Sequence, residues 1–358
     1  MDMHLTVPSG SKFKPEPDRR KLRHIANLLE QENKFLLTCH IRPDGDALGS
    51  ILALGLTLME HGKDVTIYST DPVPNYLKFL EGYNLITNEV SPLHKDTTLI
   101  VIDCNEPKRI GPEGTMLFET AKDIIILDHH LGDEKIQENI FYYKEPSLFA
   151  AAAIIVWVIE ELGWPITKSV AENLYTAILT DTGCFRHNNT TALAFAMAEK
   201  LVLCGARPEF VARMLYQNYS LTRLKLLALV LRTLEVKANG KIAIIQATPQ
   251  MFRTSEATES DAEDFVSYAR SLNTVEVAAF IREVHAGQCS VSLRSKTFFN
   301  VAEIAKKFGG GGHFNAAGFK ATGNAPYIRE ILLRELESAI TSMVQDMDTI
   351  AGTESGDV

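Results

Sequence analysis

Residues 35–50 read FLLTCHIRPDGDALGS, and this stretch decides the fold class of the first part of the chain. Residues 35–39 form a compact apolar run without the alternation of a half-exposed strand, which predicts a strand buried on both faces of a parallel sheet. Pro43 and Gly45 indicate a tight turn after it. Residues 47–61 then place apolar side chains at helical spacing until Gly62, which predicts a helix.

The same alternation of strand and helix continues downstream. Because strands that alternate with helices are typical of doubly wound folds, the pattern predicts an α/β domain with a mainly parallel sheet. Further strands are expected at residues 65–69, 99–102 and 124–127, and further helices at residues 18–33, 150–162 and 168–179.

The second half of the chain has a different pattern. A mostly helical stretch leads to short strand-like runs, a hairpin signal at Asn239-Gly240 and a helix start with Asn300 as N-cap and Glu303 in the reciprocal capping position. This predicts a smaller α/β domain with a mixed sheet, separated from the first domain by a cleft. The expected strands are 241–246, 275–281 and 290–293, and the expected helices are 301–308 and about 327–347. The expected divisions are a disordered start at 1–18, a catalytic domain at 19–206, a helical linker at 207–234, a second domain at 235–347 and a disordered tail at 348–358.

The composition excludes several classes of protein. A net charge of −9, from 36 basic and 45 acidic residues, argues against a protein that coats long duplex nucleic acid. The five cysteines show no paired spacing, which favours a reducing compartment. Residues 1–20 lack the apolar core of a signal peptide, and the longest apolar run, residues 149–159, is too short to span a bilayer. We therefore expect a cytoplasmic protein that does not bind membranes.

Polar side chains follow three of the expected strands at the point where each strand ends. The first run ends in His40, the 99–102 run ends in Asp103, and the 124–127 run ends in Asp128-His129-His130. Because ligands bind beyond the carboxyl ends of strands in open α/β sheets, we expect these groups to share one rim. Asp44 and Asp46 lie in the loop after His40, and Asp181 follows a helix and could approach the same rim.

Carboxylates clustered in this way repel one another unless cations lie among them. Oxygen and imidazole donors without thiolate suit Mn²⁺, with Mg²⁺, Fe²⁺ and Co²⁺ as alternatives. Each residue alone has an ordinary alternative, because Asp44, Asp46 and Asp103 could be turn or helix-cap residues, and His129-His130 could be satisfied polar residues. Their joint occurrence at the ends of apolar elements favours a metal site.

These segments resemble the motifs of the DHH phosphoesterases, which are named for the triplet seen here as Asp128-His129-His130. The stretch GGGGHFNAAG at residues 309–318 is similar to the signature of the DHH-associated C-terminal domain. The resemblance covers roughly residues 20–345, and the motifs occur in the family's order. The chain is most similar to the stand-alone nano-RNase branch of the family.

The resemblance implies a centre with two divalent metal ions, in which Asp103 bridges the ions. It implies that His130 acts near the scissile phosphate as a proton donor or charge stabiliser, and that Asp128 orients a histidine. The implied ligands of one ion are His40, Asp44 and Asp103, and those of the other are Asp46, Asp103, His129 and Asp181.

Substrate contacts are expected in the second domain. Consecutive glycines allow backbone N–H groups to converge on an anion, although a flexible turn is the ordinary alternative. Arg294 could bind a terminal phosphate through two hydrogen bonds, and a surface salt bridge is its alternative. The candidate substrate-binding residues are Arg282, Ser292, Arg294, Ser295, Gly310, Gly311, Gly312 and His313.

The resemblance implies an enzyme that hydrolyses very short oligoribonucleotides or dinucleotides such as pApA to mononucleotides. 3′-Phosphoadenosine 5′-phosphate is a further candidate substrate. Cyclic di-AMP hydrolysis is an alternative, and a non-catalytic nucleotide-binding protein is a second one. Inorganic pyrophosphatase is disfavoured, because those relatives carry a lysine-centred C-terminal signature. A homodimer is left open.

Overall fold

The computed structural model describes residues 16–130, 138–285 and 287–354, and the chain divides into two compact units between Asn218 and Tyr219. This division lies inside the expected linker. Helix α8 (Pro208–Tyr216) packs into the core of the first unit, and α9 (Leu221–Leu231) packs into a core of the second. The start of the chain at 1–15 lies outside the described residues, and Asp18 caps the first helix.

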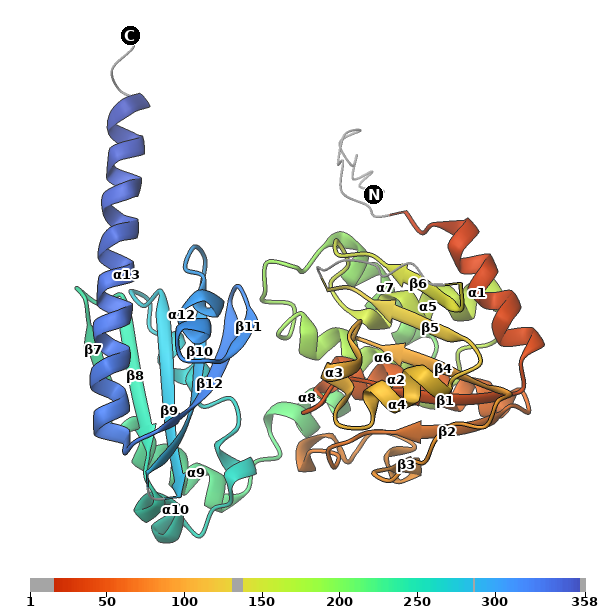
Figure 1. Cartoon of the computed structure of the whole chain (residues 1–358), viewed down its shortest axis with the longest axis horizontal. Coiled ribbons are helices and arrows are strands. Elements are labelled where there is room, and N and C mark those ends of the chain that lie inside the picture. Colours follow the sequence, from red (N-terminus) through yellow and green to blue (C-terminus); the bar gives the residue numbers. More distant parts are fainter. Residues whose placement is uncertain (1–15, 131–137, 286, 355–358) are drawn as a thin grey trace, which may run out of the picture. The chain divides into compact units, whose positions relative to one another are not determined.

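The first unit is built on a six-stranded sheet in which every pair of neighbouring strands is parallel (Figure 1). The prediction of a doubly wound parallel sheet is therefore confirmed. The strand order β3-β2-β1-β4-β5-β6 reverses direction between β1 and β4, which is where ligands bind in such sheets. The strands are β1 (Lys34–Thr38), β2 (Asp64–Tyr68), β3 (Ile86–Thr87), β4 (Thr97–Ile102), β5 (Ile124–Asp128) and β6 (Ile140–Lys144).

Helices cover both faces of this sheet. Strand β4 is buried along its whole length, with Ile100 and Ile102 in one core and Leu99 and Val101 in the other. The larger core is closed by α1 (Arg19–Gln31), α2 (Gly45–Glu60), α5 (Ala151–Leu162), α6 (Lys168–Asp181), α7 (Ala192–Leu203) and α8. The smaller core lies under α3 (Pro107–Ile110) and α4 (Gly114–Thr120).

The second unit has a six-stranded sheet of order β11-β12-β10-β9-β8-β7, in which only β8 and β9 are parallel. This confirms the predicted mixed sheet and the β7–β8 hairpin at Asn239-Gly240. Its strands are β7 (Glu235–Lys237), β8 (Ile242–Ala247), β9 (Val277–His285), β10 (Gln288–Ser295), β11 (Gly311–His313) and β12 (Ala316–Thr322). Its remaining helices are α10 (Pro249–Ser255), α11 (Val266–Arg270), α12 (Val301–Lys307) and α13 (Ala325–Glu354).

One face of this second sheet is only partly covered. Helices α12 and α13 pack on one face of β8, β9, β10 and β12. On the other face, the core under α9, α10 and α11 includes side chains of β8 and β9. Burial alternates along β10 between buried and half-exposed residues. Every second residue of β10 therefore presents its side chain on a face with access to solvent.

Two local expectations are corrected by the structure. Asn300 accepts the N–H of Ala302 at 3.1 Å as predicted, but the Glu303 carboxylate accepts from the Asn300 side chain at 3.2 Å, so the reciprocal capping bond to the backbone is not formed. Helix α13 continues to Glu354, beyond the helix end expected at about residue 347. No proline interrupts the helical backbone there.

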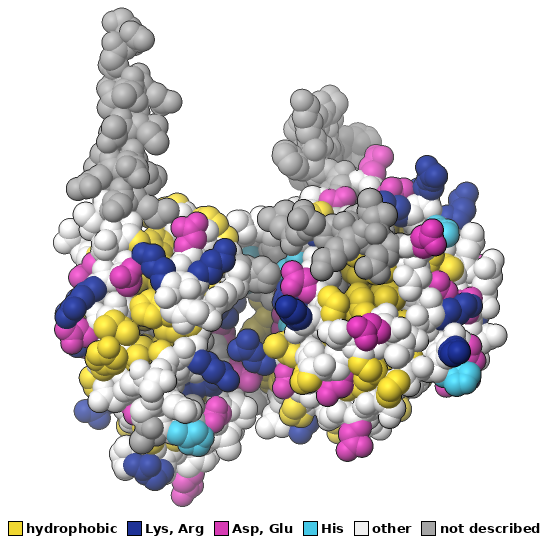
Figure 2. Space-filling model, in the orientation of Figure 1, with side chains coloured by type: hydrophobic (Ala, Val, Ile, Leu, Met, Phe, Trp, Pro, Cys, Tyr) yellow, Lys and Arg dark blue, Asp and Glu magenta, His cyan; other side chains and the backbone are white. Residues whose placement is uncertain are grey.

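The charged surface is mixed. In the view of Figure 2, acidic and basic side chains are interspersed over the described residues of each unit. Within the described part of the chain, none of the helices combines the length and the apolarity that a membrane crossing requires.

Candidate metal centre

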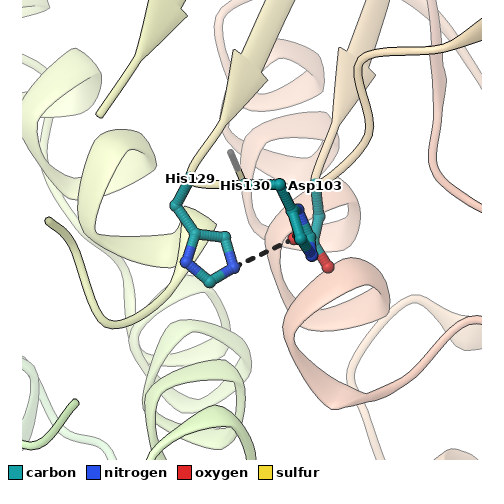
Figure 3. Close-up of side chains that lie close together, drawn as sticks. All are labelled: Asp103, His129 and His130. Atoms are coloured by element: carbon teal, nitrogen blue, oxygen red, sulfur yellow. Dashed lines mark ion pairs between the residues drawn. The ribbon is translucent and has the colours of Figure 1, made fainter. Parts of the chain in front are cut away.

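Three neighbouring strands deliver the central groups of the site. His40 follows β1, Asp103 follows β4, and His129 follows the last residue of β5. His40 Nε2 lies 3.3 Å from Asp103 Oδ2, and His129 Nε2 lies 3.3 Å from Asp103 Oδ1 (Figure 3). The two oxygens of Asp103 therefore face imidazoles from both adjacent strand ends.

The conformation and burial of Asp103 mark it as the centre of this cluster. Its backbone has a φ of 59°, which only a small share of residues other than glycine adopt, although aspartate and asparagine are enriched among them. The side chain is almost completely buried, yet Oδ1 accepts no well-formed hydrogen bond from any described residue. A buried carboxylate oxygen without a donor is costly unless a cation completes its surroundings.

Asp44 and Asp46 enter the site from the start of α2. Asp44 caps the helix by accepting the N–H groups of Asp46 and Ala47, so its ordinary interpretation as a cap is also correct. Its Oδ1 lies 4.0 Å from His40 Nε2, which leaves it available as a ligand beside that ring.

Asp46 has a second structural role at the start of α5. Its carboxylate accepts the N–H groups of Ala151 at 2.6 Å and Ala152 at 3.0 Å, and α5 has no side-chain cap of its own. Its Oδ2 also lies 3.8 Å from His129 Nε2. Asp46 therefore joins the candidate centre to the N-terminus of a buried helix, where negative charge is stabilised.

Asp181 reaches the site through close packing of α2 on α6. A Cβ atom at Gly45 would lie 2.4 Å from Thr180 Oγ1, and one at Gly49 would lie 2.5 Å from the carbonyl oxygen of Asn173. Only glycine permits this approach, which brings Asp181 at the end of α6 to the start of α2. Asp181 thereby joins a group that also contains Asp46 and His129.

The cluster forms three overlapping groups whose ligand atoms lie within 4.8 Å of one another. The first has the composition predicted for one ion. The second lacks Asp103, which instead forms a third group with the neighbouring histidines, including His130, a residue predicted not to be a ligand. The groups are His40, Asp44 and Asp103; Asp46, His129 and Asp181; and Asp103, His129 and His130.

The titration behaviour of the cluster fits a cation site. Burial raises the pKa of Asp46 well above its ordinary value, and burial raises the pKa of Asp181 to about 7. For His40, burial favours the neutral form, but hydrogen bonding to Asp103 and the charge of Asp44 raise its pKa to about 9. In the metal-free cluster, bound protons therefore neutralise negative charge of the carboxylates, a role that divalent ions would take over when they bind.

The donor set contains oxygen and imidazole nitrogen without thiolate. Burial raises the pKa of Cys104 to about 11 and that of Cys39 well above its ordinary value, so both cysteines stay protonated thiols. Hard oxygen donors with imidazole suit Mn²⁺, Mg²⁺, Fe²⁺ or Co²⁺ better than a thiolate zinc site. The residues present therefore fit the predicted pair of divalent ions.

Contacts around the ligands fix their orientation. His40 Nδ1 lies 2.9 Å from the carbonyl oxygen of Ile41, and His129 Nδ1 lies 3.1 Å from that of Leu148. A carbonyl can only accept, so each Nδ1 carries a proton and the Nε2 atoms face the carboxylates. Asp128 Oδ1 lies 2.7 Å from His130 Nδ1, which places it where an orienting carboxylate was predicted.

Sequence reasoning missed Asn189. Its side-chain amide donates to the Asp181 carboxylate at 3.3 Å and to the Asp181 carbonyl oxygen at 3.2 Å. Asn189 therefore holds the ligand from α6 in place. Its position in the polar stretch after Asp181 was the only sequence signal, and that stretch resembles an ordinary loop.

In the second unit, the sheet register brings several predicted substrate residues together. Ser292 pairs with Gly318, which pairs with Gly311, while Arg294 pairs with Ala316 in the next row on the same face. Arg294 Nη1 donates to the carbonyl oxygen of Leu293, and no carboxylate among the described residues forms an ion pair with Arg294. The alternative of a surface salt bridge is therefore not observed for it.

Ser295 and Arg282 do not lie in the rows formed by Ser292 and Arg294. Ser295 is 1% exposed and points to the opposite face of β10, because successive side chains of a strand alternate. Arg282 pairs with Ser290, farther along the same face as Arg294, and donates to the carbonyl oxygen of Glu259 at 3.2 Å. The side chain of His313 lies outside the described part of the chain.

The glycines at 309–312 have structural roles at the end of α12 and between β11 and β12. Gly309, with a φ of 75°, ends α12, and the N–H of Gly310 returns to the carbonyl oxygen of Ala305. A Cβ atom at Gly310 would lie 2.2 Å from the carbonyl oxygen of Gly318, and one at Gly312 would lie 2.4 Å from that of Ala316. Gly310 and Gly312 are required for the close approach of β11 to β12, whereas a Cβ atom at Gly309 or Gly311 would meet open space.

An open α/β sheet with carboxylates and imidazoles at its switch point, joined to a mixed-sheet unit, defines the class of two-domain hydrolases with a candidate divalent metal centre. The model of the DHH family N-terminal domain matches residues 34–178, and that of the DHHA1 domain matches residues 239–346. The chain belongs to the DHH family and is a hydrolase of phosphoester bonds.

Named relatives and a solved structure agree with this family. The bifunctional oligoribonuclease and PAP phosphatase NrnA of Thermus thermophilus is 32% identical over 85% of this chain and 90% of its own length. The Bacillus subtilis protein of the same name is 25% identical over 79% of this chain and 88% of its own length. A crystal structure of an exopolyphosphatase-related protein from Bacteroides fragilis superposes with a TM-score of 0.80 at 25% identity, over 92% of this chain and 98% of the other.

Proposed function

We propose that this chain hydrolyses the phosphodiester bonds of very short oligoribonucleotides, such as pApA, to mononucleotides with two divalent ions, Mn²⁺ being favoured. The observation that carries the proposal is the buried Asp103 carboxylate, which faces imidazoles from two strands and has an oxygen without a donor. The names of the relatives from Thermus thermophilus and Bacillus subtilis support this choice of substrate.

The proposed ligands follow from the three groups of the centre. One ion would be held by His40, Asp44 and Asp103 and the other by Asp46, His129 and Asp181, each set being one of these groups. Asp103 is added to the second set as the bridge that the family resemblance implies. When bound, such a pair lowers the pKa of a shared water and neutralises the phosphoryl oxygens. His40 and His129 are already oriented for this role, because their Nδ1 protons are held by backbone carbonyls.

His130 and Asp128 form the proposed proton-donating pair. Asp128 is completely buried and holds His130 through Nδ1 at 2.7 Å. A carboxylate on Nδ1 fixes the orientation of the ring, so His130 can present Nε2 as the proton donor to the leaving ribose oxygen. This assigns Asp128 a positioning role and His130 a catalytic one.

The half-exposed face of β10 is the proposed phosphate-binding surface of the second unit. Arg294 supplies a guanidinium without a carboxylate partner, and Ser292 and Gly311 lie in the neighbouring row. Arg282 lies farther along the same face, and His313 stays a candidate from the sequence alone, whereas Ser295 lies on the buried face and Gly310 and Gly312 serve the packing of β11 on β12. A face with so few cations suits a short ligand better than long duplex nucleic acid, which requires many phosphate contacts.

3′-Phosphoadenosine 5′-phosphate is the second proposed substrate. The same relatives are named as PAP phosphatases as well as oligoribonucleases. The compound carries a phosphomonoester on a ribose oxygen, so the same ligands and the same proton donor would serve its hydrolysis.

The test compares kcat/KM for pApA, a pentanucleotide RNA, cyclic di-AMP and 3′-phosphoadenosine 5′-phosphate with Mn²⁺. We expect pApA to be the best of these and cyclic di-AMP the poorest. Asp103→Asn serves as the matched control, since asparagine tolerates the left-handed backbone at this position. Absence of hydrolysis by the wild type, or equal hydrolysis by the variant, would contradict the proposal.

A further inference from the structure

An exposed aromatic pair lies just beyond the ligand Asp181. The rings of Phe185 and Phe195 are stacked, with centroids 4.9 Å apart and planes at 21°. Phe185 is half-buried and packs against the main core of the first unit, whereas Phe195 on α7 is 55% exposed. The pair therefore presents an aromatic surface to solvent, and the packing of Phe185 against the core holds this surface in place.

The turn that carries Phe185 is held in an unusual backbone conformation. Gly183, Cys184 and Phe185 have consecutive φ values of 56°, 61° and 59°. Left-handed backbone costs roughly 1–2 kcal/mol for each residue other than glycine, and normally occurs at single residues. Strain of this kind persists where surrounding contacts impose it, and it gathers at functional sites.

Hydrogen bonds impose this conformation. The N–H of Phe185 donates to Thr182 Oγ1 at 3.1 Å, and the N–H of Cys184 donates to the carbonyl oxygen of Leu179 at 2.7 Å. Thr182 is completely buried directly after Asp181. Asp181 and Phe185 thus belong to one hydrogen-bonded turn, and their Cα atoms, four peptide units of 3.8 Å apart along the chain, are separated by no more than about 15 Å.

We propose that Phe185 and Phe195 form a stacking platform for a nucleobase of the substrate whose scissile phosphate lies at the metal centre. The inference rests on the proposed function and adds a base-binding subsite to it. Every base has a π-face, so stacking on an aromatic ring holds an oligonucleotide without selecting its sequence. A partly exposed phenylalanine packed on a second ring offers such a face, and the turn that carries Phe185 starts at the ligand Asp181.

The experiment measures kcat and KM of the full-length protein with Mn²⁺ for pApA and for two analogues, each lacking one of the two bases. We expect Phe195→Leu to raise KM for pApA between about fivefold and a hundredfold, the range for loss of one base–aromatic stack. kcat should change little. KM for the analogue that lacks the stacked base should be the same for variant and wild type.

Two further variants sharpen the result. Phe195→Tyr keeps the ring and should retain the wild-type KM for pApA. Leu203→Ala removes an 82% exposed apolar side chain from the same helix and should leave both constants unchanged. An unchanged KM for Phe195→Leu on pApA would overturn the platform, and so would an equal rise for pApA and both analogues, since that pattern indicates a general apolar contact.

The platform and the proposed function can fail separately. If the wild type does not hydrolyse pApA, the proposed function fails. If the wild type hydrolyses pApA, Asp103→Asn does not, and Phe195→Leu equals the wild type, only the platform fails.

Discussion

The two units place functional groups on their sheets in opposite ways. In the first unit, the ends of buried parallel strands bring Asp103, Asp128 and His129 into a shielded cluster, in which hydrogen bonds with His129 and His40 hold the pKa of Asp103 well below its ordinary value despite its burial. In the second unit, the half-exposed face of β10 carries serines and one guanidinium beside glycines. A buried cluster of charged groups therefore suits bond cleavage, whereas a half-exposed row of small residues suits binding of a phosphate. Variants of the metal centre in the first unit should therefore act mainly on kcat, and variants of the β10 face in the second unit on KM.

The largest effect is expected for Asp103→Asn. Removing the carboxylate between His40 and His129 should lower kcat for pApA by at least about a thousandfold, because several kcal/mol of charge stabilisation by metal are lost. Circular dichroism and the urea midpoint should show a folded protein. A fully active variant would remove Asp103 from the centre.

Metal affinity should depend strongly on pH. In the metal-free protein, the pKa of His40 is about 9 and that of Asp181 is about 7, so both hold protons that a metal must displace. Affinity for Mn²⁺ should therefore rise as pH increases from 6 to 9, by roughly tenfold per pH unit for each proton released. Titration calorimetry of the metal-free protein in buffers of different ionisation enthalpy measures the protons released, and a pH-independent affinity would contradict the expected competition.

In the second unit, Arg294→Ala should raise KM for pApA by about tenfold and change kcat little, because one charge-assisted phosphate contact is worth about 1.5–3 kcal/mol. The matched pair is Ser292→Ala and Ser295→Ala. Ser292 shares the open face with Arg294, whereas Ser295 is buried on the other face. A rise in KM for Ser295→Ala without one for Ser292→Ala would show that the wrong face has been chosen.

The smallest effect on chemistry is expected for Gly49→Ala. A methyl group there would lie 2.5 Å from a backbone oxygen of α6, so the free energy of unfolding should fall by about 1–3 kcal/mol despite the better helix propensity of alanine. Gly55→Ala is the control, since its methyl group would meet only the flexible end of Ile67. Urea unfolding measures both variants, and equal stabilities would show that α2 and α6 can separate without cost.

The fold was predictable where burial makes the sequence pattern extreme. Strands β1, β4 and β5 are almost completely buried, so their residues are nearly all apolar and stand out. The edge strands β3 and β6 were missed because β3 is very short and β6 is half-exposed. Residues 140–143 of β6 are nevertheless aliphatic or aromatic, so this strand could have been predicted from its composition.

The site followed the same rule. His40, Asp103 and His129 were predictable because each lies within two residues of the end of a recognisable strand. Position in the chain is then enough to predict the edge of the sheet on which each residue lies. Asn189 and Phe195 were not predictable, since their contacts with Asp181 and Phe185 depend on how α6 and α7 pack. Ser295 is different, because the period-two alternation of a strand is enough to place it on the opposite face from the other β10 candidates.

The most direct test of the central claim is the recovery of pApA hydrolysis by metal-stripped protein as Mn²⁺ is added, with bound metal counted on the same samples. We expect no hydrolysis by the stripped wild type, recovery as two ions bind per chain, and no recovery in Asp103→Asn at the same concentrations. Hydrolysis by the stripped protein, or full recovery in the variant, would contradict a metal centre at Asp103.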